Sequence, residues 1–568
     1  WMSPGGNCGL IDVTIPEAIA WLGEKHVEHA RKGMSGWWLD LGEPEKQENN
    51  GNLTYKGGSA AQVLNEYGLR WLAGVYNSMK AAFPERRQFI MPRAGTAGMQ
   101  RYSAFPWTGD ILRSDGGLKA QVPALVSASM SGVGYLGSDI GGFTANGANP
   151  DLYNRWVQLG VFYPMMRTHS ANNPEPWNGA GSNQELVKKF IRMRYQYLPY
   201  TYTMAYQNSY LGKPMARPVN FYDADKSRLA DCNDEYLWGR NVLVAPVLSG
   251  GATSRSISFP DGRWLDMNDY KVYGGGTSVT YDAPKDRLPF FLREGAFLPS
   301  FADTEYLNTE EIDTSLLTVD YFVNNTSTPM ESLYYEDDHL TPDPVGDGKY
   351  LLTHFIGYSD KGNHVIFVER EGPGFEEMPE KHHVVFRIHQ HNFSENSGSV
   401  IGFNYGDSVS DSPAMAAALV DRADSYDVIP ASGSLEELNS QSVERGYYKG
   451  NDGILYVKIP LESAMNTAIE MGTPGLLTGL AATEVVERMT LSYAHGHISY
   501  SAPQGTVNLR LDVYNATGAK VASFSSLTAD GNVAQIGLPL SPGVYVAVLS
   551  GADADGVTVS RKAKVMAK

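Results

Sequence analysis

The segment Gly33-Met-Ser-Gly-Trp-Trp-Leu-Asp40 predicts a short buried strand that ends in an acid. The segments that follow are predicted to be helical at 60–82, 118–130 and 185–206, and extended at 87–93, 132–139 and 161–167. Strands that alternate with helices indicate βαβ units and a parallel sheet. Acids at the carboxyl ends of such strands are typical of a (β/α)8 barrel, whose active site lies at that face.

After residue 212 the pattern changes to short β-rich segments separated by Gly, Asn, Asp and Pro, which is typical of β-sandwiches. The predicted fold class is therefore α/β plus all-β, in which a partial (β/α)8 TIM barrel precedes C-terminal β-sandwich domains. The predicted domains are the C-terminal portion of the barrel at 1–212, a proximal β-sandwich at 213–298, a distal β domain at 299–472 and a last β-sandwich at 473–568.

Composition excludes several classes of partner. The 568 residues include 46 basic and 63 acidic side chains, and the net charge of −17 argues against a nucleic-acid partner, which needs basic patches. No apolar run approaches the roughly 18 residues of a membrane span. The two cysteines, Cys8 and Cys232, are too few for a disulfide framework or a cysteine zinc site. We therefore expect no nucleic-acid partner and no membrane span, and the displacement on two carboxylates described next would need no metal and no organic cofactor.

Asp40 and Asp110 each follow aromatic residues, and both are predicted to lie at one rim of the barrel. Retaining hydrolysis of a glycosidic bond needs such a pair, because one carboxylate attacks the anomeric carbon while an acid protonates the leaving oxygen. The side chains of Trp38 and Trp107 would line the sugar site and exclude water from the acid that protonates the leaving oxygen. This desolvation would raise the pKa of that acid. The pattern alone also permits structural roles, with Asp40 as a helix N-cap and Asp110 in a turn.

Four segments of the chain resemble motifs of glycoside hydrolase family 31, the α-glucosidase and α-xylosidase family. They occur in the same order as in that family. Residues 37–45 resemble the nucleophile signature, and 93–110 resemble a substrate-binding arginine followed by the general-acid segment. Residues 137–143 and 166–169 resemble the motifs that end the seventh and eighth barrel strands. The resemblance extends from residue 1 to roughly residue 370.

This resemblance implies a role for each matching residue. Asp40 would be the nucleophile and Asp110 the acid/base. The implied substrate-binding residues are Trp38, Leu41, Arg93, Trp107, Asp139, Phe143 and His169. The span from Arg93 to Trp107 is one residue longer than in several relatives, so Arg101 is the alternative to Arg93.

The implied activity is that of a retaining, exo-acting α-glycosidase on oligosaccharides, with α-glucosidase or α-transglucosylase action favoured. The alternatives are an α-xylosidase or a lyase of the same family, or a catalytically inactive carbohydrate-binding surface protein. The family places a β-sandwich and further barrel strands before the position that matches residue 1. We therefore expect the chain to begin inside the barrel and to be inactive as an isolated fragment.

Residues 473–568 resemble the C-terminal sorting domain of type IX secretion cargo, with the segments 511–518 and 540–546 and the basic end 561–564 as cues. This resemblance implies contact with the secretion machinery and a bacterial protein that is secreted or held at the cell surface. The alternative is a plain β-sandwich that binds carbohydrate.

Overall fold

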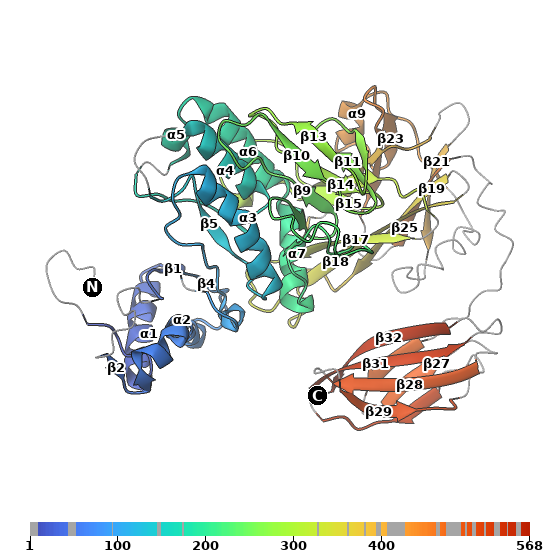
Figure 1. The fold of residues 1–568 in the computed structure, drawn as a ribbon. Coiled ribbons are helices and arrows are strands. Elements are labelled where there is room, and N and C mark those ends of the chain that lie inside the picture. The colour runs from blue at the N-terminus through green and yellow to red at the C-terminus, as the bar shows by residue number, and fades with distance from the viewer. Residues whose placement is uncertain are drawn as a thin grey trace. The chain divides into compact units, whose positions relative to one another are not determined.

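The computed structural model separates into two compact units, Trp1–Thr478 and Gly479–Lys568 (Figure 1). The structure describes residues 9–43, 53–93, 95–144, 149–172, 175–326, 329–360, 363–379, 382–393, 399–405, 427–461, 466–472, 490–494, 497–501, 507–515, 519–527, 534–541, 543–552 and 558–567. Within these residues no helix combines the length and the apolar character needed to cross a membrane.

The first part of the larger unit is built from parallel strands and helices. Strand β1 (Gly36–Leu39) pairs in parallel with β4 (Phe89–Pro92), and β5 (Gly137–Ile140) pairs in parallel with β6 (Met165–Thr168). Parallel bridges from Ile90 to Ala104 and from Trp107 to Gly137 connect the two pairs. The short strands β2 (Thr54–Tyr55) and β3 (Gly58–Ser59) form a hairpin. The helices are α1 (Pro16–Ala30), α2 (Ala60–Ala82), α3 (Asp115–Met130), α4 (Pro150–Val161), α5 (Pro176–Gly179), α6 (Gln184–Gln196) and α7 (Leu198–Leu211).

The helix predicted over 60–82 coincides with α2, which begins with a capping box between Ser59 and Gln62. The prediction of one helix over 185–206 is wrong, because the chain forms α6 and α7 with a break at Tyr197. Pro199 lies in the first turn of α7, where its missing N–H is tolerated, whereas inside a continuous helix it would remove a hydrogen bond. The strand predicted over 161–167 is also too long, since Val161 still belongs to α4.

A proximal β region follows the helices. Its six-stranded sheet has the order β12-β11-β14-β9-β8-β7, and β10 pairs with β13. Side chains from both sheets, among them Ile257, Trp264 and Phe291, share one buried core. The strands are β7 (Ala216–Arg217), β8 (Tyr236–Trp238), β9 (Val242–Val244), β10 (Ser254–Ser258), β11 (Arg263–Asp266), β12 (Val272–Gly274), β13 (Ser278–Asp282) and β14 (Phe290–Arg293).

A distal β region completes the larger unit. A five-stranded sheet, β15-β16-β20-β24-β23, and a six-stranded sheet, β17-β18-β19-β25-β21-β22, share a core that includes Tyr321, Phe355 and Phe386. Its elements are β15 (Phe297–Ser300), β16 (Leu316–Phe322), β17 (Met330–Asp337), β18 (Tyr350–Asp360), β19 (Asn363–Glu371), β20 (His383–His389), β21 (Ser399–Tyr405), β22 (Asp427–Val428), α9 (Leu435–Asn439), β23 (Gly446–Lys449), β24 (Leu455–Pro460) and β25 (Asn466–Gly472).

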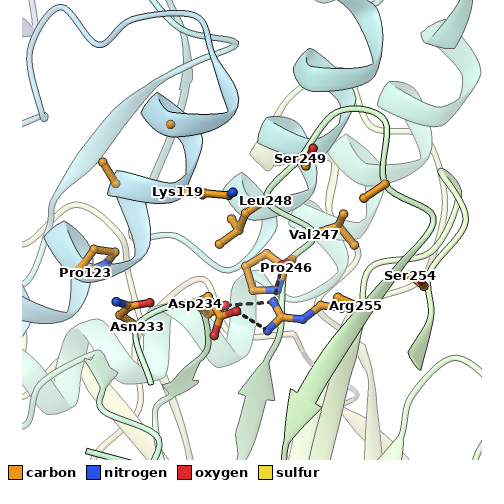
Figure 2. A pocket seen from close by; sticks show the side chains of 13 residues that line it. Lys119, Pro123, Asn233, Asp234, Pro246, Val247, Leu248, Ser249, Ser254 and Arg255 are labelled. Atoms are coloured by element: carbon orange, nitrogen blue, oxygen red, sulfur yellow. Dashed lines mark hydrogen bonds and ion pairs between the residues drawn. The ribbon is translucent and has the colours of Figure 1, made fainter. Parts of the chain in front are cut away.

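The helical part and the proximal sheet are held together by a common core. Trp156 of α4 and Trp238 of β8 are both fully buried in it, and α4 packs against α6 (Figure 1). At the edge of this contact lies a crevice of about 630 Å³ between α3 and the proximal strands (Figure 2). Arg255 lines this crevice and pairs with Asp234 at 3.1 Å (Figure 2). It also pairs with Glu235 at 2.9 Å. The shared core joins Ile140 of β5 to the proximal sheet.

The smaller unit contains two antiparallel sheets, β26-β27-β30 and β29-β28-β31-β32. Ile498 of the first sheet and Leu511 and Leu549 of the second lie in one buried core. Its strands are β26 (Thr490–Ala494), β27 (His497–Ser501), β28 (Val507–Asn515), β29 (Lys520–Phe524), β30 (Ala534–Gly537), β31 (Gly543–Ala552) and β32 (Thr558–Ala567). Parts of the segments 511–518 and 540–546 lie outside the described residues.

Candidate active site

The predicted site residues gather where the parallel strands end. Asp40 directly follows β1, Asp139 lies within β5, and His169 directly follows β6. Asp110 comes three residues after Trp107, which is bridged to the first residue of β5. Because parallel strands point the same way, their carboxyl ends bring these side chains to one face.

Arg93 connects the two predicted catalytic acids. Its Nη1 atom lies 3.4 Å from Asp40 Oδ1 and 3.7 Å from Asp110 Oδ1, and its Nη2 atom pairs with Glu43. The two aspartate oxygens are therefore no farther apart than the sum of those two distances. This maximum distance allows the carboxyl separation of roughly 5–5.5 Å that retaining glycosidases have. Of the range of roughly 6.5–9.5 Å that inverting glycosidases have, it allows only the lower end.

The surroundings of Asp40 act on the pKa of its carboxyl in opposite directions, and the net effect is to raise it. Burial raises the pKa of its carboxyl, while Arg93 and a hydrogen bond from the Leu41 N–H act in the opposite direction. Leu41 adopts φ 63°, in the left-handed region that is uncommon for a residue with a branched side chain. Such outliers concentrate at functional sites, and here the strained residue supplies the backbone donor to Asp40.

Aromatic side chains form a wall beside the acids. The rings of Trp38 and Trp107 are stacked with centroids 5.7 Å apart, and Trp38 meets His169 edge-on at 5.6 Å. Phe143 stacks on His169 at 5.3 Å. Trp38 is 49% exposed whereas Trp107 is buried, so the wall has an open face on which a flat apolar ligand can lie.

Asp139 is the deepest acid of the site and is fully buried. Burial raises its pKa to about 6, against the opposing charge of Arg167, which pairs with its Oδ1 atom. The Arg167 guanidinium also lies over the Trp107 ring, 5.0 Å from its centroid. Asp139 Oδ2 and Trp107 Nε1 are buried and have no hydrogen-bond partner among the described residues. Buried polar atoms in this condition are rare and indicate a site for a polar ligand.

The raised pKa of Asp139 predicts a pH-dependent contribution to stability. The folded protein keeps this proton up to about pH 6, whereas the unfolded chain releases it near pH 3.8. Stability therefore falls as the pH rises between those values. We expect the free energy of unfolding of the wild type, minus that of Asp139→Asn, to decrease by about 2 kcal/mol from about pH 4 to about pH 7 in denaturant titrations. Parallel pH profiles for the two proteins would contradict the assignment.

Asp110 is more exposed to solvent than the sequence predicted. Trp38 and Trp107 were predicted to desolvate Asp110, but the side chain of Asp110 is 46% exposed. The chain turns at Gly109, with φ 79°, between the buried Trp107 and Asp110, and both side chains line a cleft. This cleft has a volume of about 710 Å³ and is lined by Arg93, Trp107, Asp110 and residues of α2.

Arg93, rather than the alternative Arg101, lies beside the acids. Arg101 donates to the Gly98 carbonyl at 3.1 Å and lies over the Tyr102 ring. The sequence interpretation missed two charged residues of the site, Glu43 and Arg167. Both lie inside the quoted motifs, but charged residues next to strand ends are most often solvated, so nothing in the pattern singled them out.

Models of one protein family match two adjoining parts of the chain. The model described as the glycosyl hydrolases family 31 TIM-barrel domain matches residues 1–204, and the family 31 C-terminal domain matches residues 212–298. Together they account for just over half of the chain.

Relatives and solved structures agree with these matches. Alpha-glucosidase 2 of Bacillus thermoamyloliquefaciens is 31% identical over 373 residues, covering 64% of this chain and 46% of the relative. The alpha-xylosidase of Saccharolobus solfataricus is 31% identical over 341 residues, covering 58% and 46%. The chain thus spans about half the length of the curated relatives it matches. The family 31 dextranase of Flavobacterium johnsoniae, solved with glucose, superposes with a TM-score of 0.72 at 27% identity, covering 83% of this chain and 57% of that one. The order of the motifs, the two matched domains and these relatives together place the chain in glycoside hydrolase family 31.

Proposed function

We propose that the protein is a retaining, exo-acting α-glycosidase that acts on α-gluco-oligosaccharides as an α-glucosidase or α-transglucosylase. The observation that carries this proposal is the position of Arg93, which contacts both Asp40 and Asp110 through one nitrogen atom. Two carboxylates this close, one part-buried and one exposed in a cleft, suit a double displacement.

In the first step Asp40 attacks the anomeric carbon from the β face and forms a β-glycosyl ester, while Asp110 donates its proton to the departing oxygen. In the second step Asp110 takes a proton from water or from an acceptor sugar, which attacks the same carbon and releases the α product. The proton that Asp110 gives away is thus recovered in each cycle. Arg93 stays beside both carboxylates and compensates their charge.

The remaining residues supply the sugar site. The stacked Trp38 and Trp107 offer an apolar wall for the ring faces, and the buried Asp139 Oδ2 and Trp107 Nε1 atoms have unused capacity for sugar hydroxyls. A sugar hydroxyl can donate to a carboxylate oxygen or accept from an indole N–H. His169 and Phe143 close the other end of the wall.

A second candidate is α-xylosidase action, because relatives named alpha-xylosidase match at similar identity. A panel of aryl α-glucoside, aryl α-xyloside and α-linked glucose disaccharides separates the two. We expect kcat/KM for the glucoside to exceed that for the xyloside at least tenfold, since a site that hydrogen-bonds an extra hydroxymethyl group rejects the sugar that lacks it. The reverse order would assign the xylosidase activity.

The smaller unit bears on where in or outside the cell the protein would act. Its resemblance to a secretion sorting domain supports a protein that is exported to the cell surface or the medium, where oligosaccharides of external origin are available as substrates.

A further inference from the structure

Arg113 lies where three loops of the candidate site meet. It comes three residues after Asp110 and directly before Ser114, the N-cap of α3. The segment that carries it runs beside the loop after β5: the Phe143 N–H donates to the Ile111 carbonyl at 2.8 Å, and the Arg113 N–H donates to the Thr144 carbonyl at 2.7 Å. The loop of the predicted acid is therefore hydrogen-bonded to the loop that carries Phe143.

The Arg113 side chain extends this connection to the loop after β6. Its Nε atom donates to the Gly141 carbonyl at 3.1 Å, and its Nη2 atom lies 2.5 Å from Ser170 Oγ and 3.3 Å from the Asn172 carbonyl. Ser170 Oγ in turn donates to the Phe143 carbonyl at 3.2 Å. One guanidinium thus joins the segment after Asp110 to the two loops that bear Phe143 and His169.

The backbone of Gly142 packs closely against the backbone of Arg113. Gly142 adopts φ 81°, and a Cβ atom at this position would lie 2.5 Å from Arg113 Cα. Only glycine tolerates both that conformation and that approach. The loop after β5 is therefore pressed against Arg113 and does not merely pass near it.

We propose that Arg113 is a positioning residue that fixes the acid Asp110 relative to the wall formed by Phe143 and His169. The inference rests on the proposed glycosidase function. The described acceptors of its side chain are backbone carbonyls and a hydroxyl, so the planar fork of donors, and not the charge alone, makes the connection. Lysine keeps the charge but cannot reach both loops at once. Loss of the connection would shift Asp110 against a bound sugar, and a misplacement of about 1 Å costs about 100-fold in rate.

The test compares substrates that differ in their need for an acid. Arg113→Lys is expected to lower kcat/KM for an α-linked glucose disaccharide by about 10- to 100-fold. For a dinitrophenyl α-glucoside, whose leaving group departs without a proton, we expect a decrease of less than about threefold in the glycosylation step. The matched control is Arg70→Lys on the exposed face of α2, which should equal the wild type on both substrates. Equal losses on both substrates, or no loss on either, would overturn the inference.

A second measurement does not depend on turnover. Amide hydrogen exchange of the intact protein should accelerate in segments 141–144 and 169–172 in Arg113→Lys, with an unchanged exchange pattern in β8 and β9. This readout tests the loop connection separately from the proposed function, because it does not require turnover by either protein. Unchanged exchange in both segments overturns the connection itself.

Discussion

Asp40→Asn is expected to reduce kcat for an aryl α-glucoside by about 10⁴-fold or more, because an amide cannot form the glycosyl ester on which the double displacement depends. The substitution keeps the size of the side chain, and Arg93 retains its contacts with Glu43 and Asp110. The fold should therefore survive, and steady-state kinetics at matched protein concentration measure the loss directly.

Asp347→Asn, at an exposed loop position, is the matched control and should leave kcat unchanged. A fluorinated glycosyl fluoride should label the wild type on the peptide that contains Asp40 and leave the Asn variant unlabelled. Turnover by Asp40→Asn within about tenfold of the wild type would exclude a nucleophilic role for this residue, since loss of a nucleophile is among the costliest changes in an active site.

The sequence was most informative where local pattern and chemistry coincide. An apolar strand that ends in Asp40 predicts both a parallel strand and an acid at its carboxyl end, and β1 is followed directly by Asp40. The helix over 60–82 was predictable because its apolar period and its capping residues are both local. Strand direction brings Asp40 and Asp139 to one face, and the turn at Gly109 precedes Asp110.

What could not be predicted depends on contacts between segments far apart in the chain. The sequence left Arg101 as the alternative to Arg93, and the fold brings Arg93 to the two acids. The pairing of Arg167 with Asp139 joins neighbouring parallel strands whose register no local pattern reveals. In the distal region, β16 pairs in parallel with β20, about 67 residues later, and no local pattern reveals which strands become neighbours.

Asp110→Ala should separate the two steps of the reaction. Loss of a general acid costs about 10²–10⁴-fold. For an α-linked disaccharide, whose leaving oxygen needs a proton, we expect kcat/KM to fall by this factor. For a dinitrophenyl α-glucoside, whose leaving group departs without a proton, we expect only a small decrease in kcat/KM. With the activated substrate the glycosyl ester should accumulate, since water is no longer deprotonated. A burst of dinitrophenolate followed by a slow steady state is the expected time course.

Azide distinguishes this role from that of a nucleophile. It needs no general base, so it should accelerate the slow phase of Asp110→Ala and give the α-glycosyl azide, because it attacks the β-glycosyl ester on Asp40 from the opposite face. In Asp40→Gly the same anion would occupy the space of the missing carboxylate and give the β-glycosyl azide in one displacement. The anomeric configuration of the two products, read by NMR, therefore assigns each carboxylate. A β product from Asp110→Ala would reverse the assignments, and equal rate losses for the disaccharide and the activated glycoside would show that Asp110 does not act as the acid.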